Sequence, residues 1–237
     1  MAFINTAEKQ AILNKAFVAM NDPNKKFIIF DGLIGAGKTT LIARLSEMMN
    51  ARGLRTHAIY EPVDIWNSTG ALQYFYSDIS ANCYEFQTFT YISRIERILN
   101  EINANSDAEI FLLERSIWTD RYIFVEMLKP QFNAVQLAMY NQWCNLWMFL
   151  MPLKPSKWVF LDTSLDETMR RVNIRSRDGE TSVSVDYQTA LYAKHVEFYK
   201  MLESSDCTTL IIPPIIMNRD FKTDDGVLEE IMNLVVG

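Results

Sequence analysis

The stretch FIIFDGLIGAGKT, residues 27–39, decides the fold of this chain. Its first half is a short apolar run of the kind that forms a buried strand, and its second half, Gly32 to Thr39, satisfies the pattern G-x-x-x-x-G-K-[ST]. The residues that follow repeat on one face of a helix: Leu41, Ile42, Leu45, Met48 and Met49. A strand, a glycine-rich loop and a helix in this order predict a phosphate-binding loop at the end of a sheet.

Each part of this loop has a physical reason. Glycines let the backbone approach phosphate groups with its amides pointing inward, and Lys38 would neutralise the charge of the β- and γ-phosphates of ATP. The hydroxyl of Thr39 suits a Mg²⁺ ion. A glycine-rich turn without a ligand is the alternative, which the flanking strand and helix disfavour. The residues expected to hold the nucleotide are Gly32, Leu33, Ile34, Gly35, Ala36, Gly37, Lys38, Thr39 and Thr40.

The distribution of β-rich runs predicts the fold class. Such runs lie at residues 27–30, 56–60, 110–113, 158–161 and 209–212. Because sequence of helical length separates each run from the next, we expect an α/β fold with a parallel five-stranded sheet around the P-loop and helices on both faces. Apolar residues at helical spacing in residues 6–20 predict an N-terminal helix packed on the body. We therefore expect a helical extension, residues 1–25, and a single domain, residues 26–237.

Two longer stretches, residues 71–103 and 133–151, also read as helical. Polar residues within the second stretch make it too polar to cross a membrane. It could be a core helix or a subunit interface, and both interpretations stay open. The large side chains that raise the question are Leu137, Tyr140, Trp143, Trp147 and Met151.

Composition narrows the possible partners. A chain of 237 residues with a formal net charge of −6 is not built to hold a nucleic-acid polymer, which requires clustered positive charge. Cys83, Cys144 and Cys207 are odd in number and lack CxxC spacing, so neither a disulfide framework nor a zinc site is expected. Because the sequence shows no signal pattern and no long apolar run, we expect a cytoplasmic protein without membrane contact.

The ends of the second and third strands carry carboxylates, at Glu61-Pro62 and Glu114-Arg115. In an open parallel sheet these ends lie at the ligand edge, so both side chains should point toward the phosphate site. A placed carboxylate orients an alcohol and receives its proton as the bond to phosphorus forms. Since phosphoryl transfer has a loose transition state, positioning should matter more than basicity, and Glu61 needs no raised pKa. Solvated loop carboxylates are the alternative interpretation.

The surrounding residues resemble the deoxynucleoside kinases, and within them the deoxycytidine and deoxyguanosine kinase branch more than the thymidine kinase branch. The resemblance covers about residues 26–225 in order. Besides the phosphate loop, it is carried by residues 61–63 with Trp66, residues 86–88 with Ser93-Arg94, the block ERSIWTDRYIF at residues 114–124, and the arginines of residues 171–177 with Glu180.

This resemblance implies transfer of the γ-phosphate of ATP to the 5′-hydroxyl of a deoxynucleoside, in nucleotide salvage. Glu61 would be the general base, Arg115 would steady it and the reacting oxygens, and Lys38 would act on the phosphates. Thr39 and Glu114 would hold Mg²⁺. The residues implied to surround sugar and base are Glu61, Trp66, Tyr76, Phe86, Gln87, Thr90, Arg94, Arg115, Asp120, Phe124 and Glu180.

The donor side is expected to include an arginine-rich lid. Arg171 and Arg175 are four residues apart and share a helix face, and Arg177 lies just beyond them. The resemblance places this fork of positive charge over ATP, with Arg175 and Arg177 catalytic. The segment Asn218-Arg219-Asp220-Phe221 resembles the loop that holds the adenine, with Asp220 and Phe221 as its binding residues.

Arg94 and Asp120 fall on family positions that line the base pocket, where a buried pair would present fixed donors and acceptors. We therefore expect deoxyadenosine, deoxyguanosine or deoxycytidine to be favoured over thymidine. Thr90 leaves the choice among these three open, and a salt bridge outside the pocket is the alternative. The resemblance also implies a homodimer formed through long helices, with residues 133–151 contributing.

Two other functions compete with this one. A nucleoside monophosphate kinase similar to thymidylate kinase shares the loop, the sheet and the lid, but its acceptor phosphate would be repelled by the carboxylate of Glu61. A non-catalytic ATP-dependent switch would hydrolyse ATP slowly without an acceptor.

Overall fold

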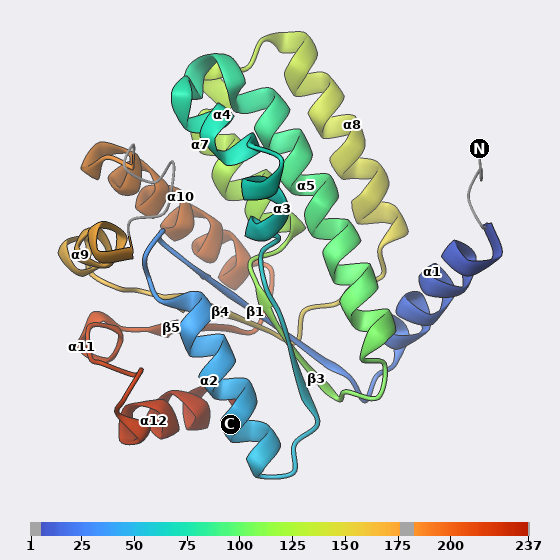
Figure 1. The fold of residues 1–237 in the computed structure, drawn as a ribbon, viewed down its shortest axis with the longest axis vertical. Coiled ribbons are helices and arrows are strands. Elements are labelled where there is room, and N and C mark those ends of the chain that lie inside the picture. Colours follow the sequence, from blue (N-terminus) through green and yellow to red (C-terminus); the bar gives the residue numbers. More distant parts are fainter. Residues whose placement is uncertain (1–5, 176–182, 237) are drawn as a thin grey trace.

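A parallel sheet forms the centre of the molecule (Figure 1). A computed structural model describes residues 6–175 and 183–236. The strands are β1 (Lys26–Gly32), β2 (Thr56–Ile59), β3 (Ile110–Glu114), β4 (Lys157–Leu161) and β5 (Thr209–Ile212). All neighbours pair in parallel in the order β2-β3-β1-β4-β5. The expected five-stranded α/β fold is confirmed, and no strand end differs from the expected run by more than two residues.

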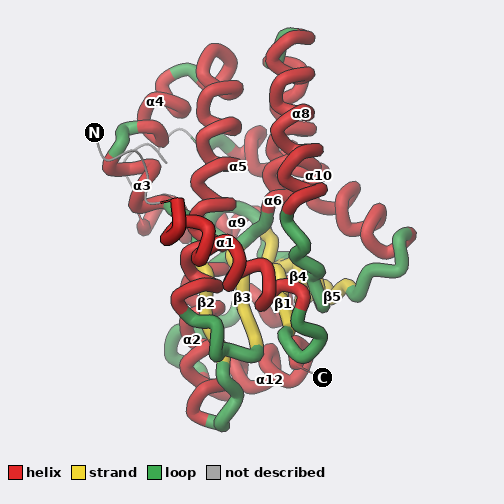
Figure 2. Tube along the Cα trace, turned by 90° about the vertical axis from the view of Figure 1, so that its right-hand side faces the viewer, coloured by secondary structure: helices red, strands yellow, loops and turns green. Residues whose placement is uncertain are grey.

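Helices cover both faces of this sheet. Helices α2 (Lys38–Ala51) and α12 (Asp225–Val236) pack on one face, while α5 (Ile79–Ala104) and α10 (Val185–Ser204) pack on the other. The apolar face expected for α2 is the face that the helix buries, since Leu41, Ile42, Leu45 and Met49 are buried. Figure 2 shows α5 and α8 (Ala134–Leu150) side by side, continuing past the end of the strands.

The stretch expected as one helix over residues 71–103 is two helices. Helix α4 (Ala71–Ser77) ends at Asp78, whose extended backbone begins α5. The carboxylate of Asp78 accepts a hydrogen bond from the amide of Ala81 at 3.0 Å. Because an aspartate in this role satisfies free amides of the new helix, it favours a helix start over continuation. The break turns α4 relative to α5, so both helices contribute to one cavity described below.

The remaining elements are short, apart from helices α1 and α9. Helix α3 (Val63–Ser68) follows Pro62, and α6 (Ile117–Thr119) leads into a π-helical segment η1 (Asp120–Val125). π-helical turns are rare in proteins, and those that occur are often found at functional sites. The others are α1 (Thr6–Asn21), α7 (Glu126–Leu128), the 3₁₀ turn η2 (Lys129–Gln131), α9 (Leu165–Arg175) and α11 (Pro214–Met217).

The N-terminal helix packs on the body of the molecule. Helix α1 contacts α5, and it buries Ala16, Ala19 and Met20. This matches the expected docking, while the division into residues 1–25 and 26–237 stays a prediction. No helix in the described ranges is both long and apolar enough to span a membrane.

Helix α8 has one buried and one exposed side, and its expected role as a subunit interface stays a prediction. It buries Tyr140 and Cys144, while Trp143 and Phe149 are exposed. One side of the helix therefore belongs to the core, and the opposite side presents apolar side chains outward.

Candidate active site

The phosphate-binding loop has the backbone that its glycines were expected to allow. Gly35 and Gly37 have φ values of 83° and 92°, in the left-handed region that favours glycine. Gly37 caps the start of α2, and a Cβ there would lie 2.5 Å from the ring of Phe221. The loop thus wraps the N-terminus of α2, where free backbone amides favour an anion.

Two cavities meet at this loop. The smaller one, of about 160 Å³, lies between the loop, the ends of β2 and β3, and helices α3 to α5. The larger one, of about 560 Å³, lies between the loop, α9 and residues 218–222. Both cavities are lined by Gly35, Lys38, Thr39, Glu114 and Arg175.

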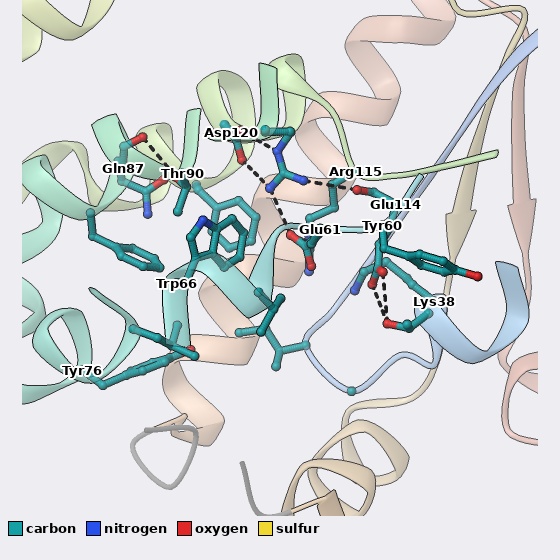
Figure 3. Close-up of a pocket in the computed structure, with 18 of the residues that line it drawn as sticks. Lys38, Tyr60, Glu61, Trp66, Tyr76, Gln87, Thr90, Glu114, Arg115 and Asp120 are labelled. Carbon is teal, nitrogen blue, oxygen red and sulfur yellow. Dashed lines mark hydrogen bonds and ion pairs between the residues drawn. The ribbon is translucent and has the colours of Figure 1, made fainter. Parts of the chain in front are cut away.

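The smaller cavity collects the expected acceptor residues from six separate segments. In Figure 3, Gln87, Thr90 and Trp66 lie on one side of Glu61, and Lys38 lies on the other. Glu180, like Arg177 of the lid, lies outside the described residues. The expected residues that line this cavity are Glu61, Trp66, Tyr76, Phe86, Gln87, Thr90, Arg94, Arg115, Asp120 and Phe124.

Arg94 joins the carboxylates of this cavity. Its guanidinium, 3% exposed, donates to both oxygens of Asp120 at 2.8 and 3.0 Å and to Glu61 Oε1 at 3.0 Å. Arg115 Nε lies 3.2 Å from the same oxygen of Glu61. The expected pairing of Arg94 with Asp120 is therefore present inside the cavity, and Arg94 also holds the strand-end carboxylate.

These arginines determine the charge of Glu61. Burial alone would raise the pKa of its carboxyl, but the charges of Arg115, Arg94 and Lys38 outweigh burial and lower the pKa to about 2. Glu61 is therefore an anion at neutral pH. It lies where it can accept a hydrogen bond from a hydroxyl. Its pKa is not raised, in agreement with the expectation that Glu61 needs no raised pKa.

Thr39 and Glu114 bring oxygen atoms together beside the loop. Thr39 Oγ1 lies 2.9 and 3.0 Å from the two carboxylate oxygens of Glu114. Burial and the nearby charge of Glu61 raise the pKa of Glu114 above its usual range. Lys38 Nζ donates to the carbonyl oxygens of Gly32 and Leu33 at 3.2 and 2.9 Å. Burial and the charge of Arg115 lower the pKa of Lys38 to about 7.

Aromatic side chains form the apolar walls of the smaller cavity. Trp66 Nε1 donates to Ser93 Oγ at 2.9 Å, which fixes the indole ring. The rings of Trp66 and Phe86 meet edge to face at 5.9 Å between centroids. On another wall, the guanidinium of Arg115 lies 4.8 Å from the ring centroid of Phe124. These contacts hold flat surfaces around a space next to the ionised carboxylate.

The larger cavity contains the expected donor residues. Arg171 donates to the carbonyl oxygens of Ala36 and Met217 at 3.0 and 2.8 Å, and its guanidinium lies 5.3 Å from the ring centroid of Phe221. Arg171 thus ties α9 to the phosphate loop and to the segment before Phe221. The expected residues that line this cavity are Gly35, Gly37, Lys38, Thr39, Thr40, Arg171, Arg175, Asp220 and Phe221.

Four residues of the expected nucleotide loop do not line the larger cavity. Within the loop, Gly32, Leu33 and Ala36 are buried and line neither cavity. Ile34 lines the smaller cavity, not the larger one. These residues therefore shape the loop through their backbone and core packing.

Comparison with known proteins agrees with this geometry. A family model described as deoxynucleoside kinase matches residues 28–236. The chain belongs to the deoxynucleoside kinase family. It is an ATP-dependent kinase that phosphorylates deoxynucleosides.

Three relatives illustrate the similarity. The probable deoxycytidine kinase of fowlpox virus is 29% identical over 197 residues, which cover 82% of this chain and 79% of the viral one. Human deoxycytidine kinase is 26% identical over 227 residues, covering 83% and 85% of the two chains. Deoxyadenosine kinase of Dictyostelium discoideum is 31% identical over 173 residues, covering 72% and 65%. The expected branch of the family is confirmed.

Several residues of this deoxynucleoside kinase line the cavities without having been expected. Tyr60 and Val63 flank the Glu61-Pro62 pair, so their position at the strand end could have indicated them. Leu72 and Tyr187 carry no such signal, because their approach depends on how α4 and α10 pack. The larger cavity adds Glu167, Arg170, Ile174 and Lys222, while Asn218 and Arg219, which also line it, belong to the segment expected to hold the adenine.

Replacing Arg94 with alanine should destabilise the kinase strongly. The change leaves Asp120 and Glu61 buried with less compensating charge, and breaking such a buried pair costs about 3–5 kcal/mol. Arg97 is the matched control, because it lies on the same helix in a more exposed pair with Asp64, where alanine should cost about 0–1 kcal/mol. Urea unfolding measures both, and equal losses would contradict the assigned role of Arg94.

Proposed function

We propose that this kinase transfers the γ-phosphate of ATP to the 5′-hydroxyl of deoxyadenosine, deoxyguanosine or deoxycytidine in preference to thymidine. The observation that carries the proposal is the position of Glu61. Its ionised carboxylate lies in a cavity that joins the phosphate loop to a pocket walled by Trp66, Phe86 and Phe124. This carboxylate would orient the hydroxyl oxygen of an alcohol bound between it and the loop, and that oxygen is the nucleophile of the reaction.

The reaction then follows from the positions of three side chains. Glu61 accepts the hydrogen bond of the 5′-hydroxyl and takes its proton as the new oxygen–phosphorus bond forms and the bond to the β-phosphate oxygen breaks. Arg115, bound to Glu61 at 3.2 Å, fixes this carboxylate and offers positive charge to the reacting oxygens. Lys38 stabilises the negative charge on the β- and γ-phosphates.

Mg²⁺ is the metal that the donor atoms fit. Thr39 and Glu114 supply a hydroxyl and a carboxylate, both hard oxygen ligands of the kind Mg²⁺ prefers. The described part of the chain contains no cluster of three or more His, Cys, Asp or Glu side chains arranged for a metal. Mg²⁺ in kinases is commonly held by one or two protein groups together with phosphates and water, and there it neutralises phosphate charge.

The donor side is proposed to take ATP across the larger cavity. Arg175 lines both cavities, which supports a role at the phosphate that passes between them. Phe221 lines this cavity beside Arg171, which supports a place for the adenine there. The proposed catalytic role of Arg177 and the sugar contact of Glu180 remain predictions, since both residues lie outside the described ranges.

The preference among bases is proposed from the buried pair at the end of the pocket. Both oxygens of Asp120 are bound to Arg94, so the charges there are fixed and a base must match them. Gln87 and Thr90 line the same end and can present amide and hydroxyl groups to a base edge. The relatives named deoxycytidine, deoxyadenosine and deoxyguanosine kinases support the same preference.

A nucleoside monophosphate kinase is disfavoured by the charge of Glu61. With its pKa lowered to about 2, this carboxylate is an anion throughout the neutral range. An acceptor phosphate placed beside it would be repelled, whereas an alcohol would be bound.

We also propose that two copies associate through α8. Exposed apolar residues follow one stripe of this helix: Val135, Met139, Trp143, Leu146, Phe149 and Leu150. A contiguous apolar patch on a protein surface marks an interaction site. The helix has no charged residue, so the same stripe on a second copy can pack against it without repulsion.

The proposed location is the cytoplasm. Cys83, Cys144 and Cys207 are free thiols, which suits a reducing compartment.

The base preference can be measured directly. The kinase is incubated with ATP, Mg²⁺ and one acceptor at a time, and ADP is followed for the four deoxynucleosides and for thymidylate. We expect kcat/KM for at least one of deoxyadenosine, deoxyguanosine and deoxycytidine to exceed that for thymidine by roughly 10²-fold or more. Equal values for all four would contradict the role of the Arg94–Asp120 pair, and turnover of thymidylate alone would favour the monophosphate kinase.

The role of Glu61 predicts a loss of turnover in E61Q. An amide keeps the shape of the side chain but cannot take the proton, so kcat should fall by about 10²–10⁴-fold. D64N is the matched control, because Asp64 lies three residues away in an exposed pair with Arg97. Its kcat should stay near that of the wild type. A native kcat for E61Q would refute the proposed base.

The dimer predicts a difference between two equally exposed apolar residues. Phe149 on α8 is 85% exposed and Ile215 on α11 is 80% exposed. F149D should shift the protein from dimer to monomer in sedimentation experiments, because a charge would be buried between the copies. I215D should remain a dimer. A wild-type monomer at micromolar concentration, or an F149D dimer, would contradict this interface.

A further inference from the structure

Asp31 is a buried acid that the proposed chemistry does not use. It lies in β1 directly before Gly32, where the phosphate loop begins, and its side chain is fully buried. Acids are rarely this buried unless they are paired. Thr119 Oγ1 donates to Asp31 Oδ1 at 2.9 Å, while Oδ2 is buried without a partner in the described part of the chain.

The hydrogen bond to Thr119 anchors the loop that carries Arg115. Ser116 and Thr119 cap each other, with the Ser116 amide donating to Thr119 Oγ1 at 3.0 Å and the Thr119 amide donating to Ser116 Oγ at 3.2 Å. The amide of Arg115 itself donates to the carbonyl oxygen of Phe30, the residue before Asp31, at 3.0 Å. The end of β1 therefore holds this loop at two points.

Arg115 needs such support because its backbone is strained. Its φ of 64° lies in the left-handed region, which a residue with a side chain adopts only where its surroundings enforce it. Strain of this kind is found where a side chain must be aimed at a site. Here the strained residue carries the guanidinium that contacts Glu61.

The charge of Arg115 also acts on Asp31. Arg115 Nη1 is a buried donor without a partner among the described residues, just as Asp31 Oδ2 is a buried acceptor without one. The charge of Arg115 is the strongest of the influences that favour ionised Asp31, followed by Thr119 and Lys38. Burial nevertheless dominates and raises the pKa of Asp31 to about 6. Keeping this carboxylate ionised at neutral pH therefore costs stability, which is typical of groups retained for function.

We propose that Asp31 is a positioning residue that holds the Arg115 guanidinium against Glu61, through the Thr119 anchor and through its own charge. The proposal builds on the proposed function and assigns a second counter-charge to the same arginine. During transfer, Glu61 takes the proton of the 5′-hydroxyl and loses its negative charge. The negative charge of Asp31 then still attracts Arg115. The guanidinium therefore stays in place for the charge that develops on the phosphate oxygens.

The substitution D31N tests this idea with little change in shape. The amide oxygen can still accept from Thr119, but the negative charge that acts on Arg115 is lost. We expect kcat to fall by about 10–10²-fold, the size of effect that misplacing a group near the reacting atoms can have, while KM for ATP and for the deoxynucleoside stay within about threefold because Asp31 touches neither substrate. The melting temperature at pH 7.5 should be equal or higher. A carboxyl whose folded pKa is raised loses stability as pH rises through that pKa, and the amide avoids this loss.

A double-mutant cycle separates positioning from a general structural role. In R115A, the group that Asp31 positions is absent, so adding D31N should change kcat by less than about twofold, whereas independent effects would multiply. Transfer of labelled γ-phosphate over hours measures the low rates. If D31N does not fold, T119V takes its place in the same cycle, because it removes the anchoring hydroxyl and leaves the carboxylate.

Three results would overturn the proposal. They are a D31N kcat within twofold of the wild type, multiplicative losses in the cycle, or a loss of kcat in D31N that follows a matching loss of folded protein while T119V is fully active. Failure of the proposed function itself would look different, because the wild-type protein would then release no ADP in response to any deoxynucleoside.

Discussion

Mutual compensation of buried charges is the constraint on which this site depends. Asp120 is buried and Glu61 is largely buried, so each carboxylate would be destabilising without a charged partner. Arg94 binds both, and Arg115 binds Glu61 from another side. Because removing any one of these charges leaves its partners uncompensated, their positions are fixed together, and the proposed catalytic carboxylate and the proposed base pocket form one unit.

The parallel sheet brings this unit to the phosphate loop. Strands β1, β2 and β3 end at the same edge, so Glu61 and Glu114 follow directly from the pairing that aligns their strands with the loop. This part of the arrangement could be predicted from the sequence, since apolar runs fix the strands and the fold rule fixes which end carries the ligand. The ordered blocks of residues likewise predicted the lining of the smaller cavity.

Other features required the three-dimensional structure. The helix break at Asp78 was missed, because a single capping aspartate in a long apolar stretch is a weak signal against continued helix. Tyr187 reaches the cavity only through the packing of α10. The contact between Arg94 and Glu61 joins residues 33 positions apart, and the family resemblance indicated only the pairing of Arg94 with Asp120. On α8, the sequence left core and interface open because the apolar residues surround most of the helix, and only burial distinguishes its two sides.

Lys38 shows how the same balance of charges connects nucleotide binding to chemistry. Burial and the neighbouring Arg115 disfavour its protonated form and lower its pKa to about 7, although Glu114 and Glu61 oppose this effect. Phosphate groups entering the loop would add negative charge close to Lys38 and so favour the protonated lysine. Part of the binding free energy would then restore the positive charge that the γ-phosphate needs during transfer. The loop would therefore carry its full positive charge only with the proposed nucleotide bound, at the junction where the smaller cavity begins.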